Sequence, residues 1–126
     1  MTMEEPLTLY DQLGDENLKK LLDAFYDKVF ESKVIGHMFK STPKEVIKDK
    51  QFSFLSQFLG GPLRYNQKYG QPKMRMRHLP HPIDQAAKEE WLSLMKSSID
   101  SLDVDPEFKV TLYACFPNVA EFMVNR

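Results

Sequence analysis

The sequence has a single cysteine, no long apolar run and no signal pattern at its start. Cys115 is the only cysteine among the 126 residues, which excludes an internal disulfide and suits a reducing compartment. No apolar run approaches the roughly 20 residues that a membrane-spanning helix needs. The short acidic start, Met1–Pro6, has no basic-then-apolar signal pattern. We therefore expect no membrane association and a cytoplasmic location.

The chain also has almost no net charge and no strand pattern. Its net charge is −1, with 42% apolar and 28% charged residues, which is an ordinary globular composition. There is no internal repeat, and the length predicts one domain over residues 1–126. The excess of positive charge is confined to residues 60–82, which carry +5 while the remainder carries −6 (−1 minus +5), and this argues against a nucleic-acid-binding protein.

What the sequence has in abundance is apolar residues at helical spacing, which predicts an all-α fold. We expect a short turn of helix over residues 7–14, then helices over about 15–32, from 43 to a stop at 60–62, over about 84–102, and from 105 towards 124. Asp15 is expected to cap the first long helix, and Thr42 and Glu45 to form a capping box on the next. Pro117 should kink the last helix.

Residues 60–82 interrupt this pattern with a long connection. They hold three glycines, four prolines, five basic residues and no acidic one. Structureless connections beyond roughly 12–15 residues are uncommon in compact domains and are usually functional or disordered. His78 lies near the end of this segment among cations and apolar residues. An anionic ligand with an apolar body and a need for imidazole, such as haem, would explain the whole segment.

Three hydrogen-bonding side chains fall on the apolar faces of the predicted helices. Tyr26 flanks the first stripe, Gln51 lies on the inward face of the second helix, and Trp91 lies on the apolar face of the third. Each alone has a structural interpretation: Tyr26 and Trp91 are common core residues, and Gln51 is evenly balanced between a structural hydrogen bond and a ligand contact. Together they predict a pocket for a small polar ligand. The pair His78 and His81 makes only a weak zinc site, because no cysteine or carboxylate is near. Cys115 is expected to be a buried apolar residue.

Several motifs make the chain resemble a group II (O-type) truncated haemoglobin, the short bacterial globin with a two-over-two helical sandwich. The similarity covers roughly residues 10–125. Its most specific parts are Phe25-Tyr26, the run from Phe54 to Pro62, Arg77-His78-Leu79-Pro80, Trp91-Leu92 and Met123-Val124-Asn125.

The resemblance implies a role for each candidate residue around haem b. His78 matches the proximal ligand of the iron, and Tyr26, Gln51 and Trp91 match the distal group that donates hydrogen bonds to bound dioxygen. Residues expected to bind the haem itself are Phe39, Phe54 and Trp91 through their rings, and Lys50, Arg75 and Arg77, with Tyr65, through its propionates.

The chain departs from the family pattern at Ile47, Phe52-Ser53 and Pro117. Ile47 stands where the gate residue of the distal side is expected, often a small or polar one. A β-branched apolar group there supplies no hydrogen bond and narrows that route of ligand access. Counting back from Gly60-Gly61 gives Gln51 as the distal glutamine, although a register one or two residues away stays open.

Three functions remain as hypotheses. The first is a cytoplasmic haem protein, a monomer or weak homodimer, that binds and transports O2 reversibly and also binds CO and NO. The second uses the same site as an enzyme, a nitric oxide dioxygenase or a peroxidase-like protein with a reductase partner. The third is a haem-free helical module that binds an acidic partner through Arg64, Lys68, Lys73, Arg75 and Arg77.

Overall fold

A computed structural model describes residues 7–71 and 83–125, and within these ranges every regular element is helical, as the sequence predicts. The elements are α1 (Leu9–Glu31), η1 (Gly36–Phe39), α2 (Lys44–Phe58), α3 (Arg64–Tyr69), α5 (Gln85–Asp100), α6 (Pro106–Tyr113) and α7 (Pro117–Met123). None of the helices in the described ranges is long and apolar enough to cross a membrane. The residues Lys73, Arg75, Arg77, His78 and His81, to which the sequence assigns predicted roles, lie outside the described residues.

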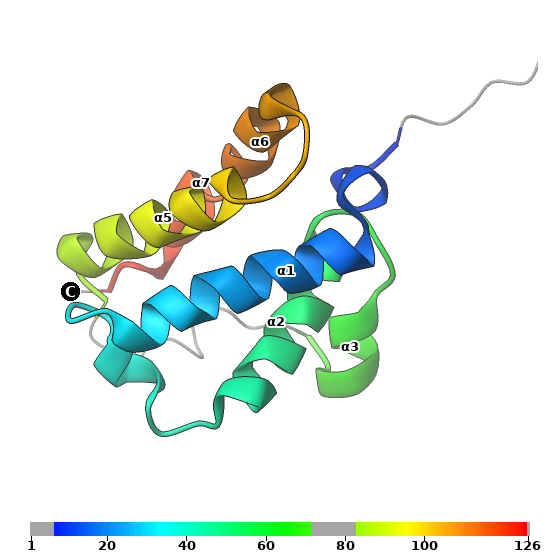
Figure 1. The fold of residues 1–126 in the computed structure, drawn as a ribbon. Helices are drawn as coiled ribbons and strands as arrows, with labels where there is room; N and C mark the ends of the chain where they lie inside the picture. Colours follow the sequence, from blue (N-terminus) through cyan, green and yellow to red (C-terminus); the bar gives the residue numbers. More distant parts are fainter. Residues whose placement is uncertain (1–6, 72–82, 126) are drawn as a thin grey trace, which may run out of the picture.

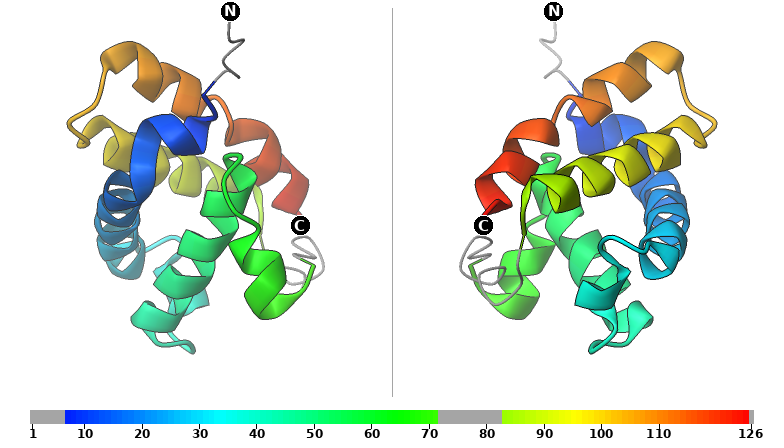
Figure 2. Two further views of the ribbon diagram at one scale, coloured as in Figure 1. Left: turned by 90° about the vertical axis from the view of Figure 1, so that its right-hand side faces the viewer. Right: turned by 90° about the vertical axis from the view of Figure 1, so that its left-hand side faces the viewer.

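The helices form a two-over-two sandwich, which confirms the expected fold class. One layer contains α1 and α2, and the other contains α5 with α6 and α7 (Figure 1). The layers meet where α1 packs on α5, while the short α3 lies against α2, as the side views show (Figure 2). Leu18, Leu21 and Phe25 of α1 are fully enclosed with Met95 and Ile99 of α5. Burial of this apolar surface is the main force that holds the two layers together.

Helix α1 begins at Leu9, six residues before the predicted start of the first long helix at Asp15. Thr8 caps it through a capping box, because its hydroxyl accepts from the Asp11 amide at 3.0 Å and the Asp11 carboxylate accepts from the Thr8 amide at 3.2 Å. Gly14 then breaks the helix with φ of 78°, as the predicted turn requires. Asp15 was expected to act as a cap, but its carboxylate instead binds Tyr10 and Arg64.

Proline at the start of helix α2 and glycine after its end determine where this helix begins and ends, without a side-chain cap. The predicted capping box of Thr42 and Glu45 is wrong: Pro43 occupies the cap position and no side chain hydrogen bonds there. The predicted stop is correct. A Cβ on Gly61 would lie 2.6 Å from the Tyr10 ring and 2.8 Å from the Ser56 carbonyl oxygen, so only glycine allows the chain to turn this close to α1.

Two other expectations needed correction. The segment after Gly61 was predicted to lack helical structure, but residues 64–69 form α3, a helix too short to show an apolar period. The last helix was expected to kink at Pro117, but it divides in two. Helix α6 ends at Tyr113 and Pro117 starts α7 at a first-turn position, where a missing amide hydrogen costs no hydrogen bond.

Candidate functional site

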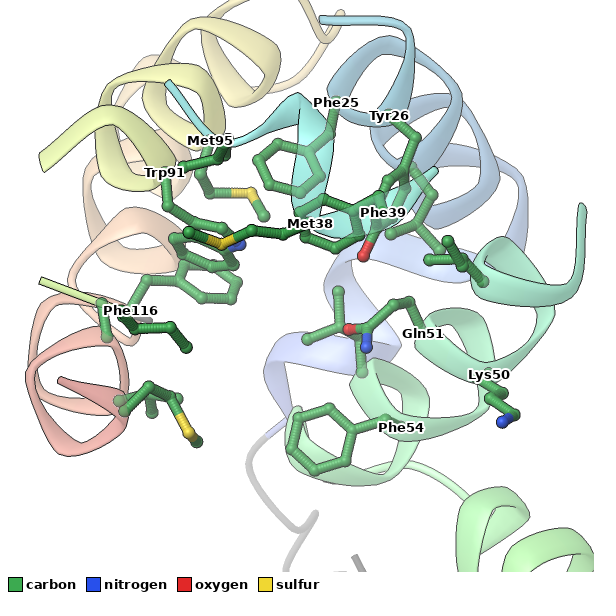
Figure 3. Close-up of a pocket in the computed structure, with 18 of the residues that line it drawn as sticks. Phe25, Tyr26, Met38, Phe39, Lys50, Gln51, Phe54, Trp91, Met95 and Phe116 are labelled. Carbon is green, nitrogen blue, oxygen red and sulfur yellow. The ribbon is translucent and has the colours of Figure 1, made fainter. Parts of the chain in front are cut away.

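A cavity of about 470 Å³ lies between the two layers (Figure 3). Helices α1, α2, α3, α5 and α7 and the turn η1 all contribute to its wall. Eight of the lining residues are aromatic: Phe25, Tyr26, Phe39, Phe54, Phe58, Tyr65, Trp91 and Phe116. Its volume lies within the range of roughly 300–1,000 Å³ that is typical of small-molecule and cofactor sites.

Tyr26 brings a phenol to this cavity from α1. Its ring is 3% exposed and lies edge-on to Phe25, at 5.0 Å between centroids, and to Phe39, at 6.1 Å. Burial raises the pKa of Tyr26, so its hydroxyl keeps its proton and can donate it in a hydrogen bond. None of the described residues hydrogen bonds with this hydroxyl, which leaves the donor available to a guest in the cavity.

Gln51 brings an amide to the same cavity from α2. Its side chain is half-buried, and Figure 3 shows it reaching towards the space beneath the Tyr26 ring. Within the described ranges we find no hydrogen-bond partner for this amide. The structural interpretation of Gln51, a bond to another helix, therefore has no support from the described residues. A polar guest would offset the cost of enclosing it.

Trp91 supplies the third donor, from α5. Its ring lies edge-on to Phe25, at 5.2 Å and 71°, and at 5.8 Å from Phe116. These contacts fix the plane of the indole, whose N–H can only donate. The face predicted around it is correct, since Ala87, Met95 and Ser98 are buried and Leu94 is half-buried. Three helices thus bring three donors to one cavity.

The other predicted residues of the described ranges lie around the same space. Phe39, Ile47, Lys50, Phe54 and Tyr65 all line the cavity. Lys50 lies on the outer side of α2 in Figure 3, with its Nζ 5.6 Å from the centre of the Tyr69 ring. Phe54 and Tyr65 meet edge-on, with ring centroids 5.9 Å apart.

Sequence reasoning missed the wall that α7 provides. Val119, Ala120 and Met123 line the cavity, and Lys88 of α5 holds α7 through an ion pair with Glu121, at 2.7 Å. This bond from Lys88 lowers the pKa of the Glu121 carboxyl. The segment after α7 is also held in place by two hydrogen bonds. The Asn125 side-chain Oδ1 accepts from the backbone amide of Ile83 at 3.1 Å, and the backbone amide of Asn125 donates to the Ile83 carbonyl at 2.9 Å. The apolar positions of the last predicted helix could have indicated that it forms part of this wall.

Methionines were also missed. Met38, Met95 and Met123 are the three methionines of the described ranges, and all three line the cavity. Met38 follows the first long helix in a passage that showed no period, so no pattern pointed to it. Their thioethers adapt to irregular apolar shapes, which suits a wall around a bulky guest.

Two further expectations concern residues outside the cavity. Cys115 is half-buried rather than fully buried, and desolvation raises the pKa of its thiol. Two cations of the proposed acidic-partner surface are already paired: Arg64 binds Asp15 and Lys68 binds Asp49. No cluster of three or more histidine, cysteine or acidic residues that could hold a metal ion occurs within the described ranges.

The residues that line the cavity suit a haem chemically. A porphyrin is a flat apolar ring with anionic propionates, and the wall is largely aromatic and aliphatic with Lys50 on its outer side. Tyr26, Gln51 and Trp91, which have no hydrogen-bond partner among the described residues, can donate to a small polar ligand beside such a ring.

Comparisons with known proteins agree with this geometry. The family described as bacterial-like globin matches residues 8–125. A group 2 truncated hemoglobin of Bacillus subtilis is 37% identical over 117 residues, which cover 93% of this chain and 88% of the relative.

Solved structures give the same result. The group II truncated hemoglobin of Bacillus anthracis superposes with a TM-score of 0.89 at 32% identity, covering 97% of this chain and 94% of that one. The truncated oxygen-avid haemoglobin of B. subtilis gives 0.87 at 36% identity, covering 94% and 100%. The chain therefore belongs to the bacterial-like globin family and, within it, to the group II truncated haemoglobins, whose globin fold implies a haem cofactor and the binding of diatomic gases.

Proposed function

We propose that the protein holds haem b in the described cavity, with His78 as the protein ligand of the iron, and that it binds O2 reversibly. The observation that carries the proposal is the convergence of Tyr26, Gln51 and Trp91, three donors from three helices with no partner among the described residues. The oxygen-avid relative in B. subtilis is consistent with it. When bound, the haem would supply an iron that binds a diatomic ligand.

The chain's own residues hold that ligand and exclude water. Tyr26 is almost completely enclosed and keeps its proton, so it donates a hydrogen bond to a partly negative ligand atom. Gln51 and Trp91 add donors from the other helices. Hydrogen bonds of this kind are stronger in a dry pocket than in water, so we expect high affinity and slow release.

Other residues of the proposal hold the haem. Phe39 and Phe54 contribute rings to the cavity wall, and Lys50 supplies a cation on the outer side of α2. We assign the propionates to Lys50, Tyr65, Arg75 and Arg77, through charge-assisted hydrogen bonds. A single globin domain over residues 1–126, a cytoplasmic location and a monomeric or weakly dimeric state complete the proposal.

The test is a cycle of oxygenation on the purified, haem-loaded, reduced protein. We expect its absorption spectrum to change on addition of O2 and to return when the gas is removed, over several cycles. Oxidation to the ferric form in the first cycle, with no recovery of the reduced spectrum, would contradict reversible binding.

A second candidate function is peroxidase-like turnover at the same site. The observation that favours it is a pair of tyrosine rings that leads from the cavity wall to the surface, Tyr65 and Tyr69, at 5.1 Å between centroids.

The related nitric oxide dioxygenase activity is tested by rapid mixing of the oxygenated protein with nitric oxide. Repeated turnover of this reaction needs a reductase partner.

A further inference from the structure

Two tyrosines connect the cavity with the protein surface. Tyr65 of α3 is 6% exposed and lines the cavity, where its ring lies edge-on to Phe54. Tyr69, one turn further along α3, is half-exposed, and its ring lies 5.1 Å from that of Tyr65. Adjacent phenol rings at this separation form a direct route for an electron between the cavity and solvent.

The surroundings of Tyr69 supply what a phenol needs in order to lose an electron. Its hydroxyl donates to Asp49 Oδ2 at 2.6 Å, and this bond lowers the pKa of the Asp49 carboxyl, so the carboxylate is present as an acceptor. Lys50 lies over the Tyr69 ring, with its Nζ 5.6 Å from the centroid. Because this cation disfavours a ring that becomes positively charged, the proton must leave with the electron, and Asp49 is placed to take it.

We propose that Tyr69 is a one-electron oxidation site at the surface, coupled to the cavity through Tyr65, at which a phenolic donor is oxidised when a hydroperoxide is reduced inside. The proposal rests on haem binding in the cavity as proposed above. It adds to that function a substrate class and a site remote from the distal donors.

The reaction balances with the hydroperoxide and the phenol as its only reactants. In each event the reduction of the hydroperoxide removes one electron and the phenolic proton from Tyr65. Tyr69 then returns an electron to Tyr65, which regains its proton from solvent, while Tyr69 gives its own phenolic proton to Asp49 and becomes a neutral phenoxyl radical. An external phenol (ArOH) then gives a hydrogen atom to Tyr69, which restores it. Two events supply the two electrons and, through solvent, the two protons that one hydroperoxide consumes: ROOH + 2 ArOH → ROH + H2O + 2 ArO•.

Tyr10 is a matched control that the fold itself provides. Its hydroxyl also donates to a carboxylate at 2.6 Å, that of Asp15, and a cation also lies over its ring, that of Arg64 at 5.5 Å. Yet Tyr10 does not line the cavity, and no described aromatic ring pairs with it. The two tyrosines therefore share their local chemistry and differ in their connection to the cavity.

The experiment treats the haem-loaded protein with hydrogen peroxide in the presence of a nitroso spin trap, and locates the trapped radical by peptide mass spectrometry. We expect the adduct on Tyr69, its loss in Tyr69→Phe and a reduced yield in Asp49→Asn. Tyr10→Phe should leave the adduct on Tyr69 unchanged. Oxidation of guaiacol should fall in Tyr69→Phe and stay unchanged in Tyr10→Phe.

A carbon monoxide spectrum of each preparation is recorded first, which separates the two proposals. A protein without a haem-carbonyl band fails the proposed function. A protein with that band whose adducts fall equally on Tyr10 and Tyr69, or whose guaiacol oxidation does not respond to Tyr69→Phe, overturns this inference alone. Tyr65→Phe provides a second variant: with Tyr69 intact, it should lower the Tyr69 adduct, and an undiminished yield would also overturn the proposal.

Discussion

Arg64 of α3 binds the carboxylate of Asp15 in α1 through two parallel hydrogen bonds, of 2.9 Å from Nη1 and 3.1 Å from Nη2. The same Nη1 donates to the Ser56 hydroxyl of α2 at 3.0 Å, and Tyr10 donates to the same carboxylate at 2.6 Å. One guanidinium thus joins three helices, through residues that are not part of the cavity lining. Arg64 also lies over the Phe52 ring, at 5.1 Å.

The first prediction concerns this contact. Asp15→Asn keeps the shape of the side chain but removes the charge that Arg64 binds. Because the pair is partly exposed, we expect a loss of about 1 kcal/mol in the free energy of unfolding at neutral pH. Denaturant unfolding measures it. Glu16→Gln, which removes only the exposed pair of Glu16 with Lys20, is the matched control and should have a smaller effect.

The same pair predicts a dependence on pH. Hydrogen bonds from Arg64 and then Tyr10 hold the pKa of Asp15 below its ordinary value of 3.8. A carboxyl whose pKa is lowered by folding stabilises the protein above 3.8 and loses that contribution as the pH falls through its folded pKa. Acid should therefore destabilise the native protein more than Asp15→Asn. An equal loss in both proteins would contradict the role of Asp15.

The second prediction tests Tyr26. Tyr26→Phe keeps the ring in contact with Phe25 and Phe39 and removes only the donor. A hydrogen bond worth about 0.5–1.5 kcal/mol corresponds to O2 release that is roughly 2- to 12-fold faster. Stopped-flow displacement of O2 by carbon monoxide measures the rate. Tyr113→Phe, at a tyrosine outside the cavity wall, should release O2 as the native protein does. An unchanged rate in Tyr26→Phe would remove Tyr26 from the ligand site.

The third prediction concerns access to the cavity. Ile47 lines it one helical turn before Gln51, and its branched side chain narrows the space there without offering a hydrogen bond. Ile47→Ala should speed the association of carbon monoxide after flash photolysis. Val46→Ala is the control, since Val46 is 43% exposed and is not part of the wall. If association were equally fast in the native protein and Ile47→Ala, ligands would use another route.

The fourth prediction concerns the closure of the cavity by α7. Asn125→Ala removes the oxygen that accepts from the Ile83 amide, at a cost of about 1 kcal/mol. Because Ala120 and Met123 just before it line the cavity, haem should transfer faster to an acceptor globin. Asp100→Asn, which breaks the exposed pair with Lys96 on α5, should not change the transfer rate. Equal rates in all three proteins would show that the end of the chain does not hold the wall.

The sequence was most informative where signals are local. The starts of α5 and α6 were predicted from Asp84 and Asp105, and both carboxylates do accept a hydrogen bond from the first turn of their helix. The inward positions of Tyr26, Gln51 and Trp91 followed from helical spacing alone, because one register decides which face a residue occupies.

Non-local contacts explain what could not be predicted. Local sequence favours Asp15 as a helix cap, but its carboxylate instead accepts a hydrogen bond from Arg64, which is far along the chain. Helix α3 is six residues long, and too few of them are apolar to show a period, so its helical state depends on packing against α2. The position of α7 against the cavity depends on the contact between Ile83 and Asn125. These residues are far apart in the sequence, so no local pattern predicts that they meet.

The most direct test of the account is an absorption spectrum of the purified protein with haem supplied, first ferric, then reduced, then exposed to carbon monoxide. We expect stoichiometric haem uptake, a band that shifts with carbon monoxide, and a spectrum that is lost or altered in His78→Ala. A folded protein that takes up no haem, or a His78→Ala variant with the native spectrum, would contradict it.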